Sequence, residues 1–505
     1  MLDEYVVANG QDTATRGIQV MPVKGQPYAH QQKAYDFIRK TFGLDGYNPA
    51  KGKGAALLME MGTGKTLVAI AATGCLSNQG KAARVLIVAP LPVLGVWEQE
   101  FEKFADFPYT LTVLRGTTSK KKAQLKNIDG DGLQVVVTNY DCLSKLATEL
   151  AAYKADLVIA DEGHKIKDSR TKRSKAMHKL GDLARYKLLL TGTLITNREM
   201  DVFSQYRFID HTVFGKYFLS FRDTYFDMIG YGNHTPVFRE DKKEDFLNTM
   251  HSVAFRVTKA ECLDLPAVTE EERVVELEPK AMKKYLELER TSQAQLEDSN
   301  KITAQDILTR LLRLSQFTGG YLPSDDGNEI QVSQAKLDAL AEIIRSAVNE
   351  NKKIVVMAKF SAEINAITKL LEDENVKYAL LCGKIKDKDG KIKRFQEEKD
   401  CLVFVGQIDT AALGITLTAA STMVFFSLDY SMSNFKQAKA RINRSGQTEN
   451  CHYIYLLAKD TVDAKVLETL RNKMSLAKML LDEYRKGQNP FSASPSGHST
   501  ASIAA

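Results

Sequence analysis

The sequence predicts an α/β protein that contains two parallel sheets with a helical segment between them. Two regions of the chain repeat short apolar runs, each followed by a polar or glycine-containing turn and then by a helix-like stretch. Continuous β-branched and apolar runs of this kind are typical of strands that are buried on both faces, as in parallel sheets. Between the two regions, residues 200–335 are mostly helical in pattern, charged and rich in aromatic side chains.

The strands expected in the first region are residues 85–89, 135–138, 157–160 and 187–190, and those expected in the second region are residues 354–357, 402–405, 423–426 and 452–455. Residues 286–313 have the apolar spacing of one or two amphipathic helices. After Lys486 the chain is rich in Gly, Ser, Pro and Ala, a composition that predicts disorder. We therefore predict a first sheet domain over residues 1–215, a helical insertion and linker over 216–335, a second sheet domain over 336–485 and a disordered tail over 486–505.

Length and composition exclude several classes of protein. A chain of 505 residues is too long for one ordinary core, and 44% hydrophobic with 26% charged residues is typical of a globular protein. The net charge of +6 is compatible with nucleic-acid binding but does not identify it. The six cysteines form no CxxC pair, which argues against a zinc site or a disulfide framework. The acidic N-terminus and the lack of a long apolar run predict a cytoplasmic protein that is neither secreted nor embedded in a membrane.

A glycine-containing loop precedes the helix-like stretch 67–72. It reads Gly62-Thr63-Gly64-Lys65-Thr66 and follows the apolar run 56–59. Glycines let a backbone curl so that its N–H groups and the following helix N-terminus face phosphate oxygens. Lys65 would neutralise the β and γ phosphates of ATP, and the Thr66 hydroxyl would bind Mg²⁺. Met59 stands where the strict phosphate-loop pattern has its first glycine, so a glycine-bearing turn before a core helix stays open as an alternative.

Two adjacent carboxylates, Asp161 and Glu162, directly follow the expected strand 157–160. Hydrolysis of ATP needs one carboxylate to hold Mg²⁺ and a second to polarise the attacking water, and this pair could supply both. The alternative is a solvated acidic pair at the end of a strand. His164 alone would be an ordinary polar residue; beside this pair we expect it to link the ATP site to the Thr-Gly-Thr segment at 191–193.

A basic segment, residues 437–447, contains Arg441 and Arg444. On a helix two residues three apart share a face, so these guanidinium groups could reach one phosphate together. Arginines supplied across an interface stabilise charge on a transferring phosphoryl group. The alternative is a basic, solvated helix.

Together these elements resemble the Swi/Snf-like double-stranded DNA translocases of the DEAD/DEAH-like helicase superfamily two, over residues 26–480. Gln31 in Pro27-Tyr28-Ala29-His30-Gln31 matches the family's adenine-reading glutamine. Three further stretches match motifs of the first lobe. The first is 87–91 with Trp97, Glu100, Phe101 and Phe104, and the second is 136–140. The third is Leu190-Thr191-Gly192-Thr193 with Asn197. We expect Trp97 to pack in the core or at a hinge rather than to stack on a base.

Later segments resemble the family's linker and second lobe. They are 255–259 with Leu265-Pro266, then 413–420 with its phosphate-contacting Gly414, then the Gln-Ala-x-x-Arg-x-x-Arg-x-Gly-Gln signature that begins at Gln437. The resemblance implies two RecA-like lobes, with Thr191, Thr193, His164 and Gln437 coupling ATP to movement. The departures from the family pattern are Gly163 for Ala, Leu194 and Thr196 for Pro and Gln, Thr410-Ala411-Ala412 for a basic residue, Ala and glycines, and Asn443 for His. They leave the hydrolytic residues intact.

The function that the resemblance implies is ATP-dependent movement along duplex DNA, with ATP and Mg²⁺ as cofactors, by a monomer in a bacterial or phage-infected cytoplasm. Two alternatives stay open, a strand-separating DNA or RNA helicase and a non-catalytic, ATP-gated DNA-binding scaffold. Basic stretches at 119–122, 165–175 and 384–394 would contact the phosphate backbone without reading sequence. Each of them taken alone is more typical of a solvated face.

Overall fold

The computed structural model describes residues 20–44, 46, 54–128, 130–192, 199–229, 235–262, 265–297, 304–323, 329–383, 387–411, 415–472 and 491. The chain forms two compact units. The first consists of Met1–Leu57, Gly64–Thr191 and Phe203–Arg256, and the second of Leu58–Thr63, Gly192–Val202 and Val257–Ala505. No helix among these described residues is long and apolar enough to span a bilayer.

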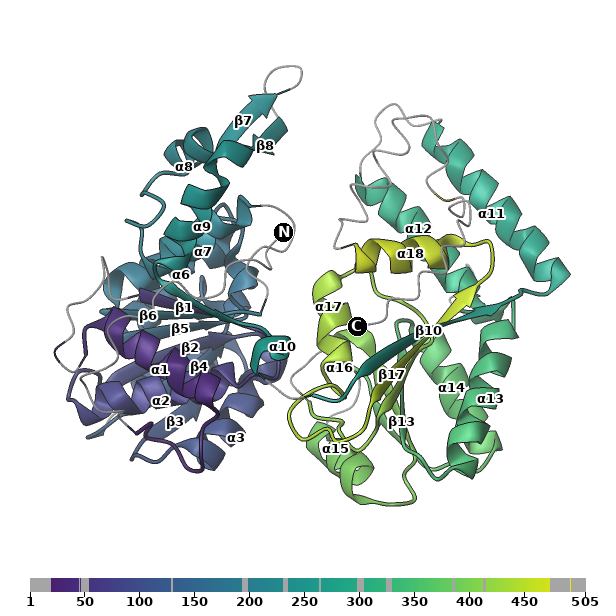
Figure 1. The fold of residues 1–505 in the computed structure, drawn as a ribbon, viewed down its shortest axis with the longest axis horizontal. Helices are drawn as coiled ribbons and strands as arrows, with labels where there is room; N and C mark the ends of the chain where they lie inside the picture. Colours follow the sequence, from purple (N-terminus) through teal and green to yellow (C-terminus); the bar gives the residue numbers. More distant parts are fainter. Residues whose placement is uncertain are drawn as a thin grey trace. The chain divides into compact units, whose positions relative to one another are not determined.

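A seven-stranded sheet in the order β3-β4-β2-β5-β6-β1-β9 organises the first part of the chain (Figure 1). Its strands are β1 (Gly54–Met59), β2 (Arg84–Ala89), β3 (Thr110–Val113), β4 (Gln134–Asn139), β5 (Leu157–Asp161), β6 (Tyr186–Leu190) and β9 (Ala254–Val257). The pairings from β3 across to β1 are all parallel. The carboxyl ends of these strands therefore lie along one edge of the sheet, which is where α/β proteins bind ligands.

The helices of this region are α1 (Ala29–Phe42), α2 (Lys65–Asn78), α3 (Leu94–Phe104), α4 (Thr118–Lys126), α5 (Ala147–Tyr153), α6 (Lys172–Leu183), α7 (Asp201–Ile209), α8 (Phe218–Tyr225) and α9 (Lys243–His251). The hairpin of β7 (Phe226–Ile229) and β8 (Thr235–Phe238) follows α8. Aromatic rings of Phe214, Phe221, Tyr225 and Phe246 contact one another with centroids 5.3–6.4 Å apart. These contacts join α8 to α9, and the hairpin joins the same aromatic core through Phe226 and Phe238, which contact Phe221 and Phe246.

The second unit contains a six-stranded, fully parallel sheet in the order β10-β17-β16-β13-β15-β14. The strands are β10 (Val268–Val275), β13 (Ile354–Ala358), β14 (Tyr378–Leu381), β15 (Val403–Gln407), β16 (Thr422–Phe425) and β17 (Cys451–Ala458). Its helices are α10 (Lys259–Cys262), α11 (Pro279–Glu297), α12 (Ala304–Thr318), α13 (Ala335–Asn349), α14 (Ser361–Asp373), α15 (Lys388–Glu397), α16 (Ile408–Ala411), α17 (Met432–Lys439) and α18 (Val462–Arg471). A short hairpin of β11 (Tyr321–Pro323) and β12 (Glu329–Gln331) lies between α12 and α13.

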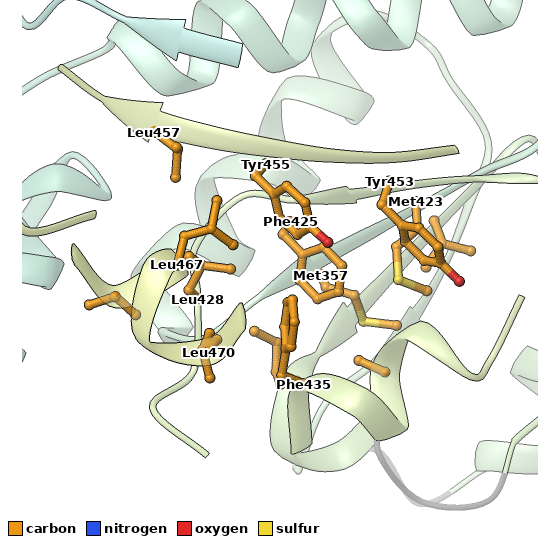
Figure 2. Close-up of a cluster of buried hydrophobic side chains, with 14 of the residues drawn as sticks. Met357, Met423, Phe425, Leu428, Phe435, Tyr453, Tyr455, Leu457, Leu467 and Leu470 are labelled. Atoms are coloured by element: carbon orange, nitrogen blue, oxygen red, sulfur yellow. The ribbon is translucent and has the colours of Figure 1, made fainter. Parts of the chain in front are cut away.

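An apolar cluster covers each face of this second sheet. Alternate residues of a strand point to opposite sides, so one strand can contribute to both clusters. Val355 and Met357 of β13 join one apolar cluster, whereas Val356 joins the other. Figure 2 shows the first cluster, in which the ring of Phe425 is stacked on Tyr455 with centroids 5.4 Å apart. Side chains of α11 and α12 also belong to this cluster, so these helices pack on the second sheet.

The predicted fold class is confirmed, because the chain contains two parallel α/β sheets. All eight predicted strands are present, as β2, β4, β5, β6, β13, β15, β16 and β17. Within the two parallel sheets, β1, β3, β9, β10 and β14 were not predicted, and neither were the hairpin strands β7, β8, β11 and β12. Strand β10 is the clearest case, because Glu270, Glu271 and Glu272 give it a polar sequence, yet it pairs along its whole length with β17. Ion pairs of these carboxylates with Lys439, Arg471 and His452 accompany that pairing.

The predicted domain boundaries stay predictions. Strand β9 and helix α9 lie within the range 216–335 that was assigned to the insertion. The predicted tail, 486–505, lies outside the described residues except for Phe491, which is fully buried in the first apolar cluster of the second unit.

A carboxyl group is buried at the start of α14. Glu363 is 1% exposed, and its Oε2 accepts hydrogen bonds from the N–H groups of Lys359 and Phe360 at 3.2 and 3.1 Å and from the Ser427 hydroxyl at 2.5 Å. Burial raises the pKa of Glu363 from 4.5 to about 7, although these hydrogen bonds act in the opposite direction. The folded state therefore favours the protonated acid at a pH where an exposed glutamate is ionised.

Glu363→Gln is expected to make unfolding less dependent on pH. The folded-state pKa is above the unfolded value, so the contribution of Glu363 to stability is full below about pH 4.5 and is lost as the pH rises through about 7. Glutamine keeps an acceptor oxygen and does not ionise. The free energy of unfolding of the variant, relative to the native chain, should therefore rise by about 3 kcal/mol between pH 4.5 and pH 8 in urea titrations. A constant difference across this range would contradict the assignment, and Glu342→Gln on the exposed side of α13 is the control.

Candidate nucleotide site

The turn between β1 and α2 has the backbone of a phosphate-binding loop. Gly62 and Gly64 have φ of +85° and +92°, in the left-handed region that glycine adopts without strain. Thr63 is 1% exposed, and both its N–H and its hydroxyl donate to the Glu60 carbonyl, at 3.3 and 2.7 Å. Helix α2 then begins at Lys65 with no side chain capping its first N–H groups. A helix start of this kind offers N–H donors and a partial positive charge to an anion.

Gln31 lies directly against this loop. Its side chain is 6% exposed, and its Oε1 accepts the Tyr28 N–H at 2.9 Å. A Cβ built on Gly64 would lie 2.1 Å from Gln31 Nε2, so the amide occupies the space that a larger residue would fill. The structure thus brings the predicted adenine-reading residue together with the predicted phosphate loop.

Asp161 is the last residue of β5, at the same carboxyl edge of the sheet. Its Oδ1 accepts the Glu162 N–H at 2.9 Å and its Oδ2 accepts the Trp97 Nε1–H, also at 2.9 Å. Burial raises the pKa of Asp161, the charge of Glu162 raises it further, and the Trp97 hydrogen bond and the charge of Lys65 act in the opposite direction. Lys65 is therefore close enough to Asp161 for its charge to act there, which joins the loop and the acidic pair in one site.

Glu162 has an unusual backbone for a glutamate. Its φ and ψ are +51° and +57°, a left-handed conformation that costs a residue with a Cβ about 1 kcal/mol or more. His164, in the short 3-10 helix η3 (Gly163–Ile166) that follows, places its Nδ1 3.2 Å from Glu162 Oε2. The sharp turn directs the chain away from β5 immediately after Asp161 and keeps Glu162 beside it.

Thr191 follows β6 and is fully buried, and its N–H donates to the Leu57 carbonyl of β1 at 3.1 Å. This bond ties the end of β6 to the strand that leads into the phosphate loop. Thr193 lies outside the described residues. The coupling role of Thr191, Thr193 and His164 stays a prediction.

In the second unit, Arg441 and Arg444 converge on one backbone carbonyl. One guanidinium nitrogen of each donates to the Ile415 oxygen, at 3.1 and 3.2 Å, and Arg441 Nε also donates to the Gln437 carbonyl at 2.8 Å. The expectation that both arginines lie on a helix is wrong, since α17 ends at Lys439. Asn443, Ser445 and Gly446 are poor helix formers, and Gly446 has φ +94°, so the arginines lie in turns instead.

The two arginines are nevertheless held together, as the spacing predicted. Gln437 contributes its backbone to this arrangement, while its side-chain amide donates to the Ser433 hydroxyl at 3.3 Å. Gly414 lies outside the described residues, so its predicted phosphate contact stays a prediction.

Two family models match the chain, the SNF2-related domain over residues 28–319 and the Helicase conserved C-terminal domain over residues 335–446. The first alone covers more than half of the 505 residues. The chain belongs to the SNF2-related family. This confirms the resemblance found in the sequence motifs.

Relatives of this SNF2-related chain come from bacteria and animals. An uncharacterized ATP-dependent helicase of Mycoplasma genitalium is 25% identical over 441 residues, covering 85% of this chain and 40% of that protein. A DNA repair and recombination protein RAD54-like of Drosophila mojavensis is 24% identical over 486 residues, covering 87% of this chain and 61% of its own length. The chain therefore spans about two fifths to three fifths of these relatives. The Sulfolobus solfataricus SWI2/SNF2 ATPase core in complex with dsDNA is 26% identical with a TM-score of 0.45, covering 94% of this chain and 96% of that one.

One departure from the SNF2-related pattern has a structural explanation. Gly163 replaces the alanine that is usual after the acidic pair, and a Cβ built on it would lie 2.5 and 2.7 Å from Cδ1 and Cγ of Leu189. Leu189 is a fully buried residue of β6. The leucine side chain fills the space of the missing methyl group, so the two residues complement each other.

Gly163→Ala is therefore expected to destabilise the chain by about 1–3 kcal/mol, because a buried leucine must shift. In a Leu189→Ala background, the same substitution should be neutral or stabilising, since the added methyl group then fills part of a cavity. Urea unfolding of the four combinations measures the coupling. Leu188→Ala is the matched control, because Leu188 is equally buried on β6 and points to the opposite face of the sheet. Equal costs in the Leu189→Ala and Leu188→Ala backgrounds would contradict the steric explanation.

Two hydrogen-bond donors of this site were not predicted from the sequence. Trp97 is buried, as expected, but its indole N–H also binds Asp161, 64 positions away. The Tyr140 hydroxyl donates to the Asp161 backbone carbonyl at 2.6 Å. Both depend on the strand order β4-β2-β5, which no local pattern in the sequence reveals.

Proposed function

We propose that this chain hydrolyses ATP and uses the energy to move along duplex DNA. The observation that carries the proposal is the arrangement of three groups at one edge of the first sheet. The phosphate loop contacts Gln31, the charge of Lys65 acts on Asp161, and Glu162 lies next to Asp161. Relatives named as ATP-dependent helicases and as DNA repair and recombination proteins support the same activity.

Thr66 and Asp161 would hold a Mg²⁺ ion, which would neutralise charge on the β and γ phosphates when bound. A hydroxyl and a carboxylate are the hard oxygen donors that Mg²⁺ prefers. The described residues contain no cluster of three or more His, Cys, Asp and Glu side chains that could hold a metal by themselves.

Lys65 and the N–H groups at the start of α2 would bind the phosphates, and Gln31 would bind the adenine. Glu162 would accept a proton from the attacking water, because it directly follows Asp161 in the chain and its carboxylate charge acts on that residue. The proximity of His164 to Glu162 Oε2 supports a role for His164 in orienting that carboxylate. These assignments give each residue of the acidic segment one task.

We propose that Arg441 and Arg444 complete the site when the two units close on ATP. Their convergence on the Ile415 carbonyl supports this, since two guanidinium groups held together can neutralise one phosphate. ATP would then favour the closed state, and hydrolysis would remove that preference. Repeated closure would move two phosphate-binding surfaces relative to each other along a DNA backbone. A monomer, and a bacterial or phage-infected cytoplasm as its location, complete the proposal.

The test compares ATP turnover with duplex DNA, single-stranded DNA and RNA, together with triplex displacement and strand unwinding. Stimulation by duplex DNA and triplex displacement without unwinding are the expected results. Because phosphate contacts dominate such binding, the stimulation should also fall steeply with added salt. Unwinding, or preferential stimulation by RNA, would instead favour a strand-separating helicase, and no turnover at all would favour an ATP-gated scaffold.

A further inference from the structure

The indole ring of Trp97 lies in the middle of α3 and is 1% exposed. It is the only tryptophan of the chain. The ring of Phe101, one turn further along α3, lies 6.3 Å from it between centroids, and Phe101 contacts Phe107 and Tyr109 in turn. Packing alone would account for a buried tryptophan in such a cluster, and it would leave the direction of the indole N–H undetermined.

The N–H points at the carboxylate that is proposed to bind Mg²⁺. Trp97 Nε1 donates to Asp161 Oδ2 at 2.9 Å, while the Glu162 N–H donates to Oδ1 at 2.9 Å. The Tyr140 hydroxyl holds the Asp161 backbone carbonyl at 2.6 Å. The carboxylate is thus held at both oxygens and at its own backbone, which fixes the rotation of the group about its last bond.

A carboxylate oxygen has two lone-pair directions, so a single N–H donor leaves one of them for a metal or a water molecule. Donors that hold a ligand in this way set its orientation, and their loss costs about 10–100-fold in metal affinity. Neither phenylalanine nor leucine at position 97 could supply such a donor. The indole therefore has a role that its bulk does not explain.

We propose that Trp97 is a positioning residue for the Mg²⁺ of bound ATP, acting through the orientation of the Asp161 carboxylate. The inference rests on the proposed ATP site. It predicts that removing the N–H weakens the Mg²⁺-dependent part of nucleotide binding and spares the part that does not depend on Mg²⁺.

The experiment measures binding of a fluorescent, non-hydrolysable ATP analogue to the full chain, in saturating Mg²⁺ and in EDTA. Trp97→Phe keeps an aromatic ring and lacks the N–H. The gain in affinity on adding Mg²⁺ should be about 10-fold smaller in this variant than in the native chain, and the affinity in EDTA should be unchanged. Phe101→Leu is the matched control, because Phe101 is equally buried on the same helix and its ring has no hydrogen-bond donor. This control should lower the melting temperature without changing the gain from Mg²⁺.

An unchanged gain in Trp97→Phe would overturn the positioning role, as would an equal loss in Phe101→Leu. Failure of the native chain to bind the analogue would instead refute the proposed ATP site, and the inference with it. If Trp97→Phe does not fold, the native chain still provides a test, since one tryptophan gives one indole ¹H–¹⁵N resonance. Nucleotide with Mg²⁺ should shift this resonance further than nucleotide in EDTA, and identical spectra would contradict the proposal.

Discussion

Replacing Glu162 by glutamine is expected to lower the rate of ATP hydrolysis by about 10³-fold and to leave ATP binding nearly unchanged. Removal of a general base costs typically 10²–10⁴-fold in rate. Glutamine has the same shape as glutamate and can replace it directly after β5, where φ is +51°, at no greater backbone cost. The substitution therefore removes a proton acceptor from the site and keeps the groups that are proposed to hold the nucleotide.

The two effects are measured separately, as phosphate release stimulated by duplex DNA and as the affinity for a fluorescent ATP analogue. Glu98→Gln is the control, because Glu98 lies on α3 and forms an exposed ion pair with Arg115 at 3.0 Å. It should behave as the native chain does. An ATPase rate that Glu162→Gln leaves unchanged would refute the assignment of the base, and a parallel loss of binding would place Glu162 among the nucleotide ligands instead.

The elements that the sequence predicted are those with continuous apolar runs. The cores of β13 and β16, residues such as Val355 and Met423, are buried whatever the neighbouring strands are, so their composition shows a strand directly. Strand β10 carries three consecutive glutamates and owes its conformation to pairing with β17 and to ion pairs with other elements. Tertiary contacts of this kind override local preference, and the sequence does not display them.

The same distinction applies to the candidate site. Lys65 and Glu162 could be identified from the sequence, because each belongs to a short motif formed by residues adjacent in the chain. Met59, which breaks the strict phosphate-loop pattern, is explained only by the structure, because it is the fully buried last residue of β1. The contact of Gly64 with Gln31 and the hydrogen bond of Trp97 to Asp161 join positions 33 and 64 apart, so they depend on the fold.

Gly64→Ala is expected to reduce affinity for ATP by about 100-fold, equivalent to about 2.7 kcal/mol. Two effects contribute. Alanine at φ +92° is strained by about 1–2 kcal/mol, and its Cβ would lie 2.1 Å from Gln31 Nε2. The end of a glutamine side chain can move at small cost to the fold. Gln31 is the proposed adenine ligand, however, so its displacement should cost far more in binding than in stability.

Gly80→Ala separates the two effects. Gly80 has φ +63° and is exposed, and a Cβ built on it has no atom within 4 Å. It should therefore share the backbone strain of Gly64→Ala and lower the melting temperature by a similar amount without affecting the affinity for the ATP analogue. Adding Gln31→Ala to Gly64→Ala should recover part of the stability and none of the affinity, because the clash is then relieved by removing the ligand itself. Equal affinities for Gly64→Ala and Gly80→Ala would show that the contact between Gln31 and the loop has no part in nucleotide binding.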